Sequence, residues 1–417
     1  MKKIIYFIVS MLLMSYVYAL DFSFVVTGDN RPSYKDQPLV YYDIVDEIAE
    51  LKPDFIISTG DIIMGHTKDI DELNNMYADF LEASAKIKDI PFYIAPGNHE
   101  EIDQKELKPI FEQYFNETYQ SFIFKNSYFI LLDSDEPGEK NRITGEQLKW
   151  LKKELKQADN FEHIFVFVHR PLYSKITHIG NCLDKYPEDR DKLVSLLKKY
   201  NTEIVFTGHI HLYDYSIIDD LTQIIVGGSG APLYADTYHE GGFNHFVYVK
   251  VKDEMTTVSV IPVENRITNA VEFYKQEEFQ QAQTEIKKAR TKHPEHREPM
   301  YFLSILYDKL DMQAEENNML IKLNNQLNSK YDLYMRLAYF AYTNELYEAA
   351  EKYFLKTTEL KPEEQESYYR LGRINQKKQA YQSALKFYQQ SLERTENEFY
   401  RKSLQKRISA INEKLNN

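Results

Sequence analysis

The sequence predicts a layered α/β domain followed by an all-α helical solenoid, and three observations support this prediction. Five short apolar runs, rich in β-branched and aromatic residues, are typical of buried strands. Helix-like stretches separate most of these runs, and this alternation of strands and helices is characteristic of α/β folds. From Val263 onward, small and aromatic residues recur every 34 residues. The predicted strands are Phe22–Thr27, Phe55–Thr59, Phe92–Ala95, Ile164–Val168 and Ile204–Thr207.

The amino terminus has the layout of a secretory signal peptide. Two lysines follow Met1, an apolar run extends from Ile4 to Tyr18, and Ala19 ends a plausible cleavage site. We therefore predict that residues 1–19 are a signal peptide and that the protein is exported, to the periplasm or the extracellular space. The alternative is that the run remains uncleaved and anchors the protein to a membrane, although it is short for a span of about twenty residues. The only cysteine, Cys182, cannot form an internal disulfide.

A polar motif follows each of the five predicted strands. Because layered α/β folds bind ligands at the carboxyl ends of their strands, these motifs are expected to meet in space. Their carboxylate, amide and imidazole groups, with no cysteine, favour Mn, Fe or Zn, and a carboxylate can bridge two such ions. The motifs are Gly28-Asp29-Asn30-Arg31, Gly60-Asp61, Gly97-Asn98-His99-Glu100, His169-Arg170 and Gly208-His209-Ile210-His211.

Each motif taken alone has a simpler explanation. A Gly-Asp after a strand is usually a turn, because Asp accepts hydrogen bonds from nearby backbone amides. His209 and His211, two residues apart, would point the same way in an extended segment, which suits chelation but does not prove it. The joint occurrence of five motifs in order favours a two-metal site.

At these motifs the chain resembles the calcineurin-like metallophosphoesterases, the superfamily of purple acid phosphatases and cyclic-nucleotide phosphodiesterases, over residues 21–262. The resemblance implies a β-sandwich flanked by helices, two divalent or trivalent metal ions and hydrolysis of a small phosphoester. It implies that Asp61 bridges both ions, and that His99 is a non-ligand acid or transition-state stabiliser oriented by Glu100. The other implied ligands are Asn98, His169 and His209 for one ion, and Asp29 and His211 for the other.

The chain departs from the family pattern at Arg31, where the family usually has a histidine ligand. That metal site would be completed by water or by Asn30, or would hold its ion weakly. Alternatively, the Arg31 guanidinium would contact the substrate phosphate and join His99 and Glu100 as a catalytic residue. Asn30, Arg170 and His178 are the residues predicted to bind substrate.

The repeat that begins at Val263 resembles tetratricopeptide (TPR) repeats. Its eighth position is Ala270, Ser304, Ala338 and Gly372, small residues that allow helices to cross closely. The segment from Phe399 to Leu415 is then expected to be a helix that caps the stack. A plain helical bundle is the alternative. Stacked helical pairs usually offer a groove, so we expect this half to bind a protein or peptide partner.

The predicted domains are residues 20–262 and 263–417, joined without a flexible linker. Phe246–Val251 and Met255–Val263 are expected to pair as the last strands of the first domain. From Val263 onward the chain has 25 basic and 23 acidic residues, a net charge of +2, so the chain total of −13 leaves −15 for the rest. An acidic first domain argues against nucleic acid as the substrate, because a polyanion needs a basic surface.

The sequence thus predicts an exported metal-dependent phosphoesterase with a TPR domain that recruits a partner or substrate. The alternative is a catalytically weak or inactive scaffold whose repeats carry the function.

Overall fold

The structure is a computed structural model that describes residues 21–100 and 105–416. The predicted signal peptide, residues 1–19, lies outside the described residues. Two β-sheets form the centre of the N-terminal domain. Their strands are β1 (Phe22–Thr27), β2 (Phe55–Ser58), β3 (Phe92–Ile94), β4 (Gln120–Phe124), β5 (Ser127–Leu132), β6 (His163–Val168), β7 (Ile204–Thr207), β8 (Tyr213–Ile218), β9 (Leu221–Val226), β10 (His245–Lys252) and β11 (Met255–Pro262).

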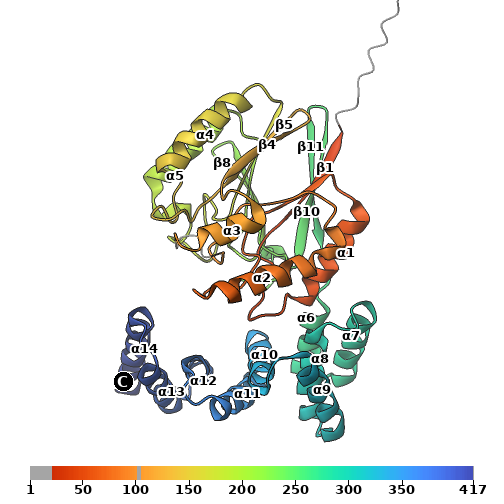
Figure 1. Ribbon diagram of the computed structural model, residues 1–417, viewed down its shortest axis with the longest axis vertical. Coiled ribbons are helices and arrows are strands. Elements are labelled where there is room, and N and C mark those ends of the chain that lie inside the picture. Colours follow the sequence, from red (N-terminus) through yellow and green to blue (C-terminus); the bar gives the residue numbers. More distant parts are fainter. Residues whose placement is uncertain (1–20, 101–104, 417) are drawn as a thin grey trace, which may run out of the picture.

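Both sheets contain parallel and antiparallel strand pairs, but they differ in strand order. Figure 1 shows the domain that they form together with its covering helices. The first sheet has the order β11-β10-β1-β2-β3, in which β1, β2 and β3 are parallel and β10 and β11 are antiparallel. The second has the order β4-β5-β6-β7-β9-β8, in which only the edge strands β4 and β8 are antiparallel to their neighbours. The carboxyl ends of the parallel strands therefore gather at one edge of each sheet.

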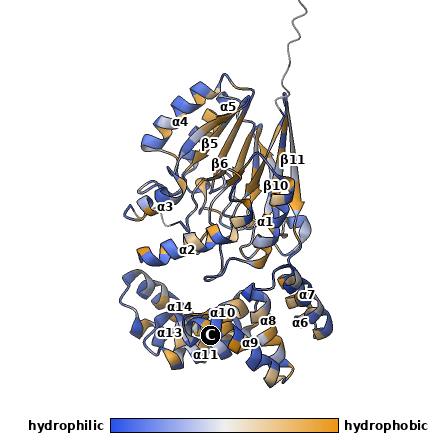
Figure 2. Ribbon diagram, turned by 45° about the vertical axis from the view of Figure 1, so that its right-hand side comes forward, coloured by the Kyte–Doolittle hydropathy of each residue, from blue (hydrophilic) through white to orange (hydrophobic). Residues whose placement is uncertain are grey.

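The sheets pack face to face over an aromatic core. Phe24 stacks on Phe55 with ring centroids 5.3 Å apart, and Phe129 of the other sheet meets Phe55 edge to face at 5.0 Å. Helices α1 (Leu39–Leu51) and α2 (Ile70–Ala83) cover the outer face of the first sheet, and α4 (Gly145–Ala158) and α5 (Pro187–Lys199) cover that of the second. Figure 2 shows the apolar strands inside these hydrophilic helix surfaces. Because both faces of each sheet are covered, the central strands are continuous apolar runs.

The predicted α/β fold class is confirmed, and the five predicted strands are present within one or two residues of their expected ends. The predicted final pair is the hairpin β10–β11, which completes the first sheet. Strands β4, β5, β8 and β9 were not predicted, and none of them ends at one of the five polar motifs. The omission matters at β5, which leads directly into Asp133 and Asp135.

The C-terminal half is a solenoid of paired helices, as the resemblance to TPR repeats predicts. The second helices of four pairs begin at Phe279, Gln313, Tyr347 and Tyr381, each 34 residues after the one before. The predicted cap helix is present as the last helix. The helices are α6 (Arg266–Lys275), α7 (Phe279–Lys292), α8 (Arg297–Lys309), α9 (Gln313–Gln326), α10 (Lys330–Thr343), α11 (Tyr347–Leu360), α12 (Gln365–Lys377), α13 (Tyr381–Arg394) and α14 (Glu398–Asn416).

The solenoid follows β11 directly and lies beneath α1 and α2 (Figures 1 and 2). Asn265 caps α6, where its Oδ1 accepts the backbone N–H of Thr268 at 3.1 Å. Leu39, at the start of α1, is buried in the hydrophobic core of the solenoid. The two halves therefore share packed surface. Within the described part of the chain, no helix has both the length and the apolar character needed to cross a membrane.

Candidate metal centre

Backbone turns at the strand ends bring the five motifs together. Asp29, Asp61 and His209 have φ angles of 57°, 55° and 67°, in the left-handed region that Asp, Asn and His tolerate better than most residues. The turns interlock, because Asp29 N–H donates to Gly60 O at 3.0 Å. Gly208 permits a close approach, since a Cβ there would lie 2.5 Å from Asp29 Oδ2. The local backbone thus directs the motif side chains into one site.

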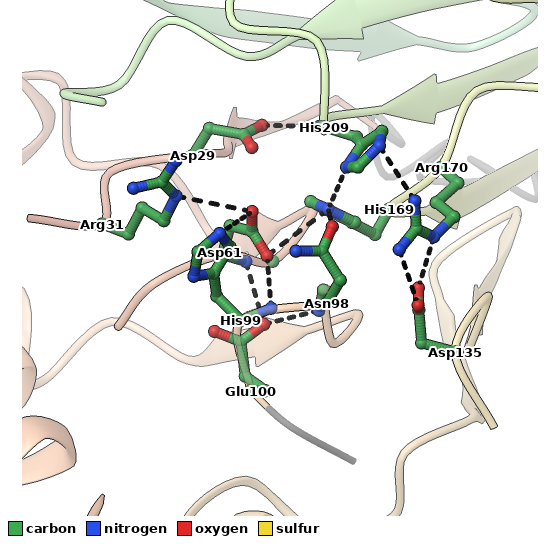
Figure 3. Close-up of polar contacts among 12 residues, drawn as sticks. Asp29, Arg31, Asp61, Asn98, His99, Glu100, Asp135, His169, Arg170 and His209 are labelled. Carbon is green, nitrogen blue, oxygen red and sulfur yellow. Dashed lines mark hydrogen bonds and ion pairs between the residues drawn. The ribbon is translucent and has the colours of Figure 1, made fainter. Parts of the chain in front are cut away.

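Two groups of potential metal ligands share Asp61. Figure 3 shows four of their members, Asp29, Asp61, His169 and His209. Asp61 groups with His169 and His209 on one side, and with Asp29 and His211 on the other. All five residues are buried. The predicted ligand Asn98 joins the first group, where its Oδ1 lies 3.2 Å from His169 Nε2. The structure therefore assembles all six predicted ligands around one shared carboxylate.

Backbone carbonyls orient two of the imidazole rings. His169 Nδ1 lies 2.8 Å from Thr59 O, and His211 Nδ1 lies 2.7 Å from Pro232 O. A ring that donates from Nδ1 leaves its Nε2 lone pair free for a metal ion. His169 Nε2 is 3.4 Å from Asp61 Oδ1, and His211 Nε2 is 3.4 Å from Asp29 Oδ1. These lone pairs converge on carboxylates, as a cation site requires.

The buried carboxylates also fit bound cations. Asp29 Oδ1 is buried without a hydrogen-bond partner among the described residues. Although burial alone would raise the pKa of Asp61, the neighbouring His169, His99 and Arg31 lower it well below its usual range. Asp61 is therefore ionised at neutral pH. A buried, ionised carboxylate next to a carboxylate oxygen without a partner needs compensating positive charge, which metal ions would supply.

His99 lies beside the shared carboxylate but belongs to neither ligand group. Its Nδ1 is 2.6 Å from Met64 O, and its Nε2 is 3.8 Å from Asp61 Oδ2. Burial lowers the pKa of His99 to about 3, although Asp61 opposes the shift. The structure thus places His99 at the site without making it a metal ligand.

Glu100 does not orient His99, which corrects the prediction from the sequence. Its carboxylate instead accepts the backbone N–H groups of Asp61 at 2.9 Å, Ile62 at 2.8 Å and Gly97 at 2.5 Å. Three amides of two motif turns satisfy this buried carboxylate, while Met64 O contacts the His99 ring. Glu100 therefore fixes the second motif against the third. Burial and the neighbouring Asp61 raise its pKa to about 7.

The predicted substrate-binding residues separate into two sets. Arg31, Arg170 and His178 line a cavity of about 350 Å³ over the ligand groups. Asn30 is not among the residues that line it, and its side-chain N–H donates to Gln37 Oε1 at 3.1 Å. This geometry does not support the prediction that Asn30 binds substrate. Its Oδ1 is buried without a hydrogen-bond partner among the described residues, so its role in completing a metal site stays a prediction.

Arg170 is held in place by a residue that the sequence argument missed. Its Nε and Nη2 each donate to Asp135 at 2.8 Å, and its Nη1 donates to Asn181 O at 2.6 Å. Arg170 Nη1 also lies 2.9 Å from His209 Nε2. Burial, and then the positive charge of Arg170, lower the pKa of His209 well below its ordinary value, so that the ring stays neutral.

Four further residues line the cavity and were not predicted: His66, Lys140, Asn181 and Tyr234. Tyr234 stacks on His211 with ring centroids 4.1 Å apart, and on His178 at 5.0 Å. Lys140, Asn181 and Tyr234 lie in loops away from the polar motifs that follow the five predicted strands, whereas His66 lies in the loop that continues the second motif. The only local signal in the sequence was their polarity, which is common in loops.

Comparison with known protein families matches residues 22–213 to the family described as calcineurin-like phosphoesterase. Those residues form a calcineurin-like phosphoesterase domain. The matched segment contains every predicted metal ligand. The expected resemblance is thus confirmed for this part of the chain.

Individual relatives of this phosphoesterase domain cover only part of the chain. A probable glycerophosphodiester phosphodiesterase GpdQ of Arcobacter nitrofigilis is 32% identical over 167 residues, which are 38% of this chain and 57% of that protein. Purple acid phosphatase 15 of Arabidopsis thaliana is 32% identical over 145 residues, which are 30% of this chain and 25% of that protein. A dimetal phosphatase structure from Danio rerio has a TM-score of 0.44 and 14% identity, covering 58% of this chain and 98% of that chain.

Proposed function

We propose that this protein is a metal-dependent phosphoesterase that hydrolyses a phosphate mono- or diester in the cavity over Asp61. The observation that carries the proposal is the position of Asp61, shared by two ligand groups within a calcineurin-like phosphoesterase domain. A shared carboxylate is what a dinuclear centre needs, because it holds two ions a few Å apart.

The proposal gives each ligand group one ion. Asn98, His169 and His209 would hold the first, Asp29 and His211 the second, and Asp61 both. Bound Mn, Fe or Zn ions would polarise the phosphoryl group and activate water for attack on phosphorus. His99, which the metals do not require, would contact the phosphoester as the transition state develops.

Arg31 would bind the phosphate directly. Its guanidinium lines the cavity, and its Nε lies 3.8 Å from Asp61 Oδ2. A guanidinium is always charged and is not a metal ligand, but its planar donors match phosphate oxygens. Water would complete the second metal site, or the Asn30 Oδ1, which is buried without a hydrogen-bond partner among the described residues.

The amino-terminal segment and the helical repeats would have two further roles, export and partner binding. We propose that residues 1–19 direct export, which sequencing the amino terminus of the mature protein would test: a start at Leu20 supports it, and a start at Met1 supports an anchored protein. We also propose that the helical repeats bind a protein or peptide.

The experiment that tests the function measures metal content and turnover in the same sample. The full chain is purified without chelator, its ions are quantified by elemental analysis, and initial rates are measured on an aryl phosphate monoester and a diester. Two bound ions with turnover would support the proposal, and the better substrate would identify the ester class. An Asp61→Asn preparation serves as the control for contaminating phosphatase. No ions and no turnover after addition of Mn, Fe or Zn would leave the scaffold alternative.

A further inference from the structure

The loop that carries the first motif continues into a segment that the helical repeats hold. After Arg31, residues 33–39 lie against α8 and α10 of the solenoid. The Tyr34 ring stacks on Tyr339 of α10, with centroids 4.5 Å apart and ring planes 9° from parallel. Lys35 Nζ lies 3.5 Å from Asp332 Oδ1 at the start of α10. Residues 33–39 of the phosphoesterase domain thus cover the surface of the repeats at α8 and α10.

Asp36 is the most strongly held residue of this segment. Its Oδ1 accepts from Arg297 Nε at 2.7 Å and lies 2.5 Å from Arg336 Nη1, while its Oδ2 accepts from Tyr301 O–H at 2.6 Å. Only 10% of the Asp36 side chain is exposed. Burial alone would raise the pKa of Asp36, but Arg336 and Arg297 lower it to about 2, which keeps the carboxylate ionised. Charge-assisted hydrogen bonds from two helices thus converge on one carboxylate.

The repeats also bind the backbone on either side of Pro38. Glu298 Oε2 accepts the N–H of Leu39 at 2.7 Å, and His296 Nε2 lies 3.0 Å from Gln37 O. Backbone contacts of this kind fix the path of the segment and not only its side chains.

Gln37 connects the segment to the metal site. Its Nε2 donates to Ile62 O at 2.8 Å, next to Asp61, and its Oε1 accepts from Asn30 at 3.1 Å, next to Asp29. Contacts therefore continue from α8 and α10 through Asp36 and Gln37 to two turns of the site. One turn carries Asp61, the shared carboxylate, and the other carries Asp29. The hydrogen bond to Gln37 Oε1 also holds the side chain of Asn30.

We propose that α8 and α10 position the first-motif loop of the phosphoesterase site, and that Asp36 is the positioning residue on which this depends. The inference rests on the proposed metal site. Residues that orient metal ligands without binding the metal themselves typically contribute about 10- to 100-fold to metal affinity or activity. Loss of Asp36 would let residues 28–38 move and would weaken the site formed by Asp29, Asp61 and His211.

The test compares four variants of the full chain: Asp36→Ala, Arg336→Ala, the two combined, and Lys292→Ala. Asp36→Ala and Arg336→Ala remove their shared ion pair from opposite domains, so one remains informative if the other fails to fold. Lys292→Ala is the control, because Lys292 Nζ forms other ion pairs between the domains, 2.6 Å from Asp43 Oδ1 and 3.2 Å from Asp46 Oδ2. Any Mn²⁺ that this control binds at Asp43, Asp46 and His293, which the loss of Lys292 uncovers, is counted separately. Each protein is measured for hydrogen exchange without metal, for Mn²⁺ affinity by calorimetry, and for kcat and KM.

We expect Asp36→Ala and Arg336→Ala to speed hydrogen exchange in residues 28–38 but not in residues 204–212. Of the two Mn²⁺ ions, both variants should bind the one with the lower affinity about tenfold less tightly. Lys292→Ala should behave as the wild type. The double variant should lose no more affinity than Asp36→Ala alone, because Arg336 acts on residues 28–38 through Asp36. The proposal is overturned if the two variants match Lys292→Ala in exchange and affinity. A wild type without turnover would refute the proposed function only, since exchange and Mn²⁺ affinity still decide the positioning role.

Discussion

Asp61 is the residue on which both ligand groups depend. Its carboxylate lies within reach of His169, His99 and Arg31, and its Oδ1 also accepts the backbone N–H of His99 at 2.9 Å. One side chain therefore organises the site electrostatically and holds the third motif in place. Substitutions at this scale separate residues that bind metal from residues that contact substrate.

Asp61→Asn should remove both ions and the turnover that depends on them, because an amide cannot replace a shared anionic ligand. Elemental analysis beside the rate assay checks this. Asp133→Asn is a matched control, because burial, and then Glu136, raise the pKa of Asp133 well above its ordinary value and so favour its neutral form. Retention of two ions in Asp61→Asn would refute the assignment of Asp61 as the shared ligand.

His99→Gln should leave the metal content unchanged and lower kcat by about 10²- to 10³-fold, the typical loss when one group that stabilises a transition state is removed. The reason is its position: His99 lies beside Asp61, its ring contacts Met64 O, and it belongs to neither ligand group. Metal content and kcat are measured on the same preparation. If metal content fell in parallel with kcat, His99 would be a ligand.

Close contacts between paired helices shape the solenoid at the scale of the element. Gly372 in α12 faces Tyr388 in α13, whose ring is fully buried and whose hydroxyl donates to Gln376 Oε1 at 2.7 Å. A Cβ at position 372 would lie 2.6 Å from the ring carbons Cδ1 and Cε1. The small residue of the 34-residue repeat is therefore required by helix packing.

Gly372→Val should destabilise the last repeats by about 1–3 kcal/mol, because the added side chain overpacks a closed interface. Thermal unfolding followed by circular dichroism measures the loss. Lys377→Val, at an exposed position of the same helix, introduces the same β-branched side chain without the clash and controls for helix propensity. Equal stability of the two variants would show that Tyr388 can move aside.

At the scale of the whole molecule, the two domains meet through charged groups as well as apolar ones. Glu298 of α8 is a carboxylate in this interface, and burial raises its pKa from 4.5 to about 7, although the Leu39 N–H opposes the shift. The folded state thus keeps the Glu298 proton at pH values where the unfolded state has released it. Stability contributed by the neutral form is lost as the pH rises from about 4.5 to 7.

Glu298→Gln should therefore be more stable than the wild type at pH 8, by about 3 kcal/mol, and similar to it at pH 4. The amide oxygen can still accept the Leu39 N–H but carries no buried charge. Tm values of both proteins between pH 4 and 8 check the prediction. A difference in Tm that does not change with pH would show that Glu298 does not titrate across the interface.

The local features of the protein can be read from its amino-acid sequence. Apolar runs specify buried strands, a 34-residue spacing specifies paired helices, and residues such as Asp61 and His209 follow strands whose ends must gather at one edge of a sheet. These properties depend on neighbours along the chain, so they are visible in the sequence. The assignment of roles to the six ligands and the export of the protein stay predictions.

Only the tertiary structure decided which distant groups meet. It showed that Glu100 binds backbone amides, that Asp135 holds Arg170, and that Asp36 lies between α8 and α10. Each of these contacts depends on strand order or on the docking of two domains. Such contacts leave no local pattern in the sequence, because a carboxylate that will be buried against a distant arginine looks the same in sequence as one that faces water.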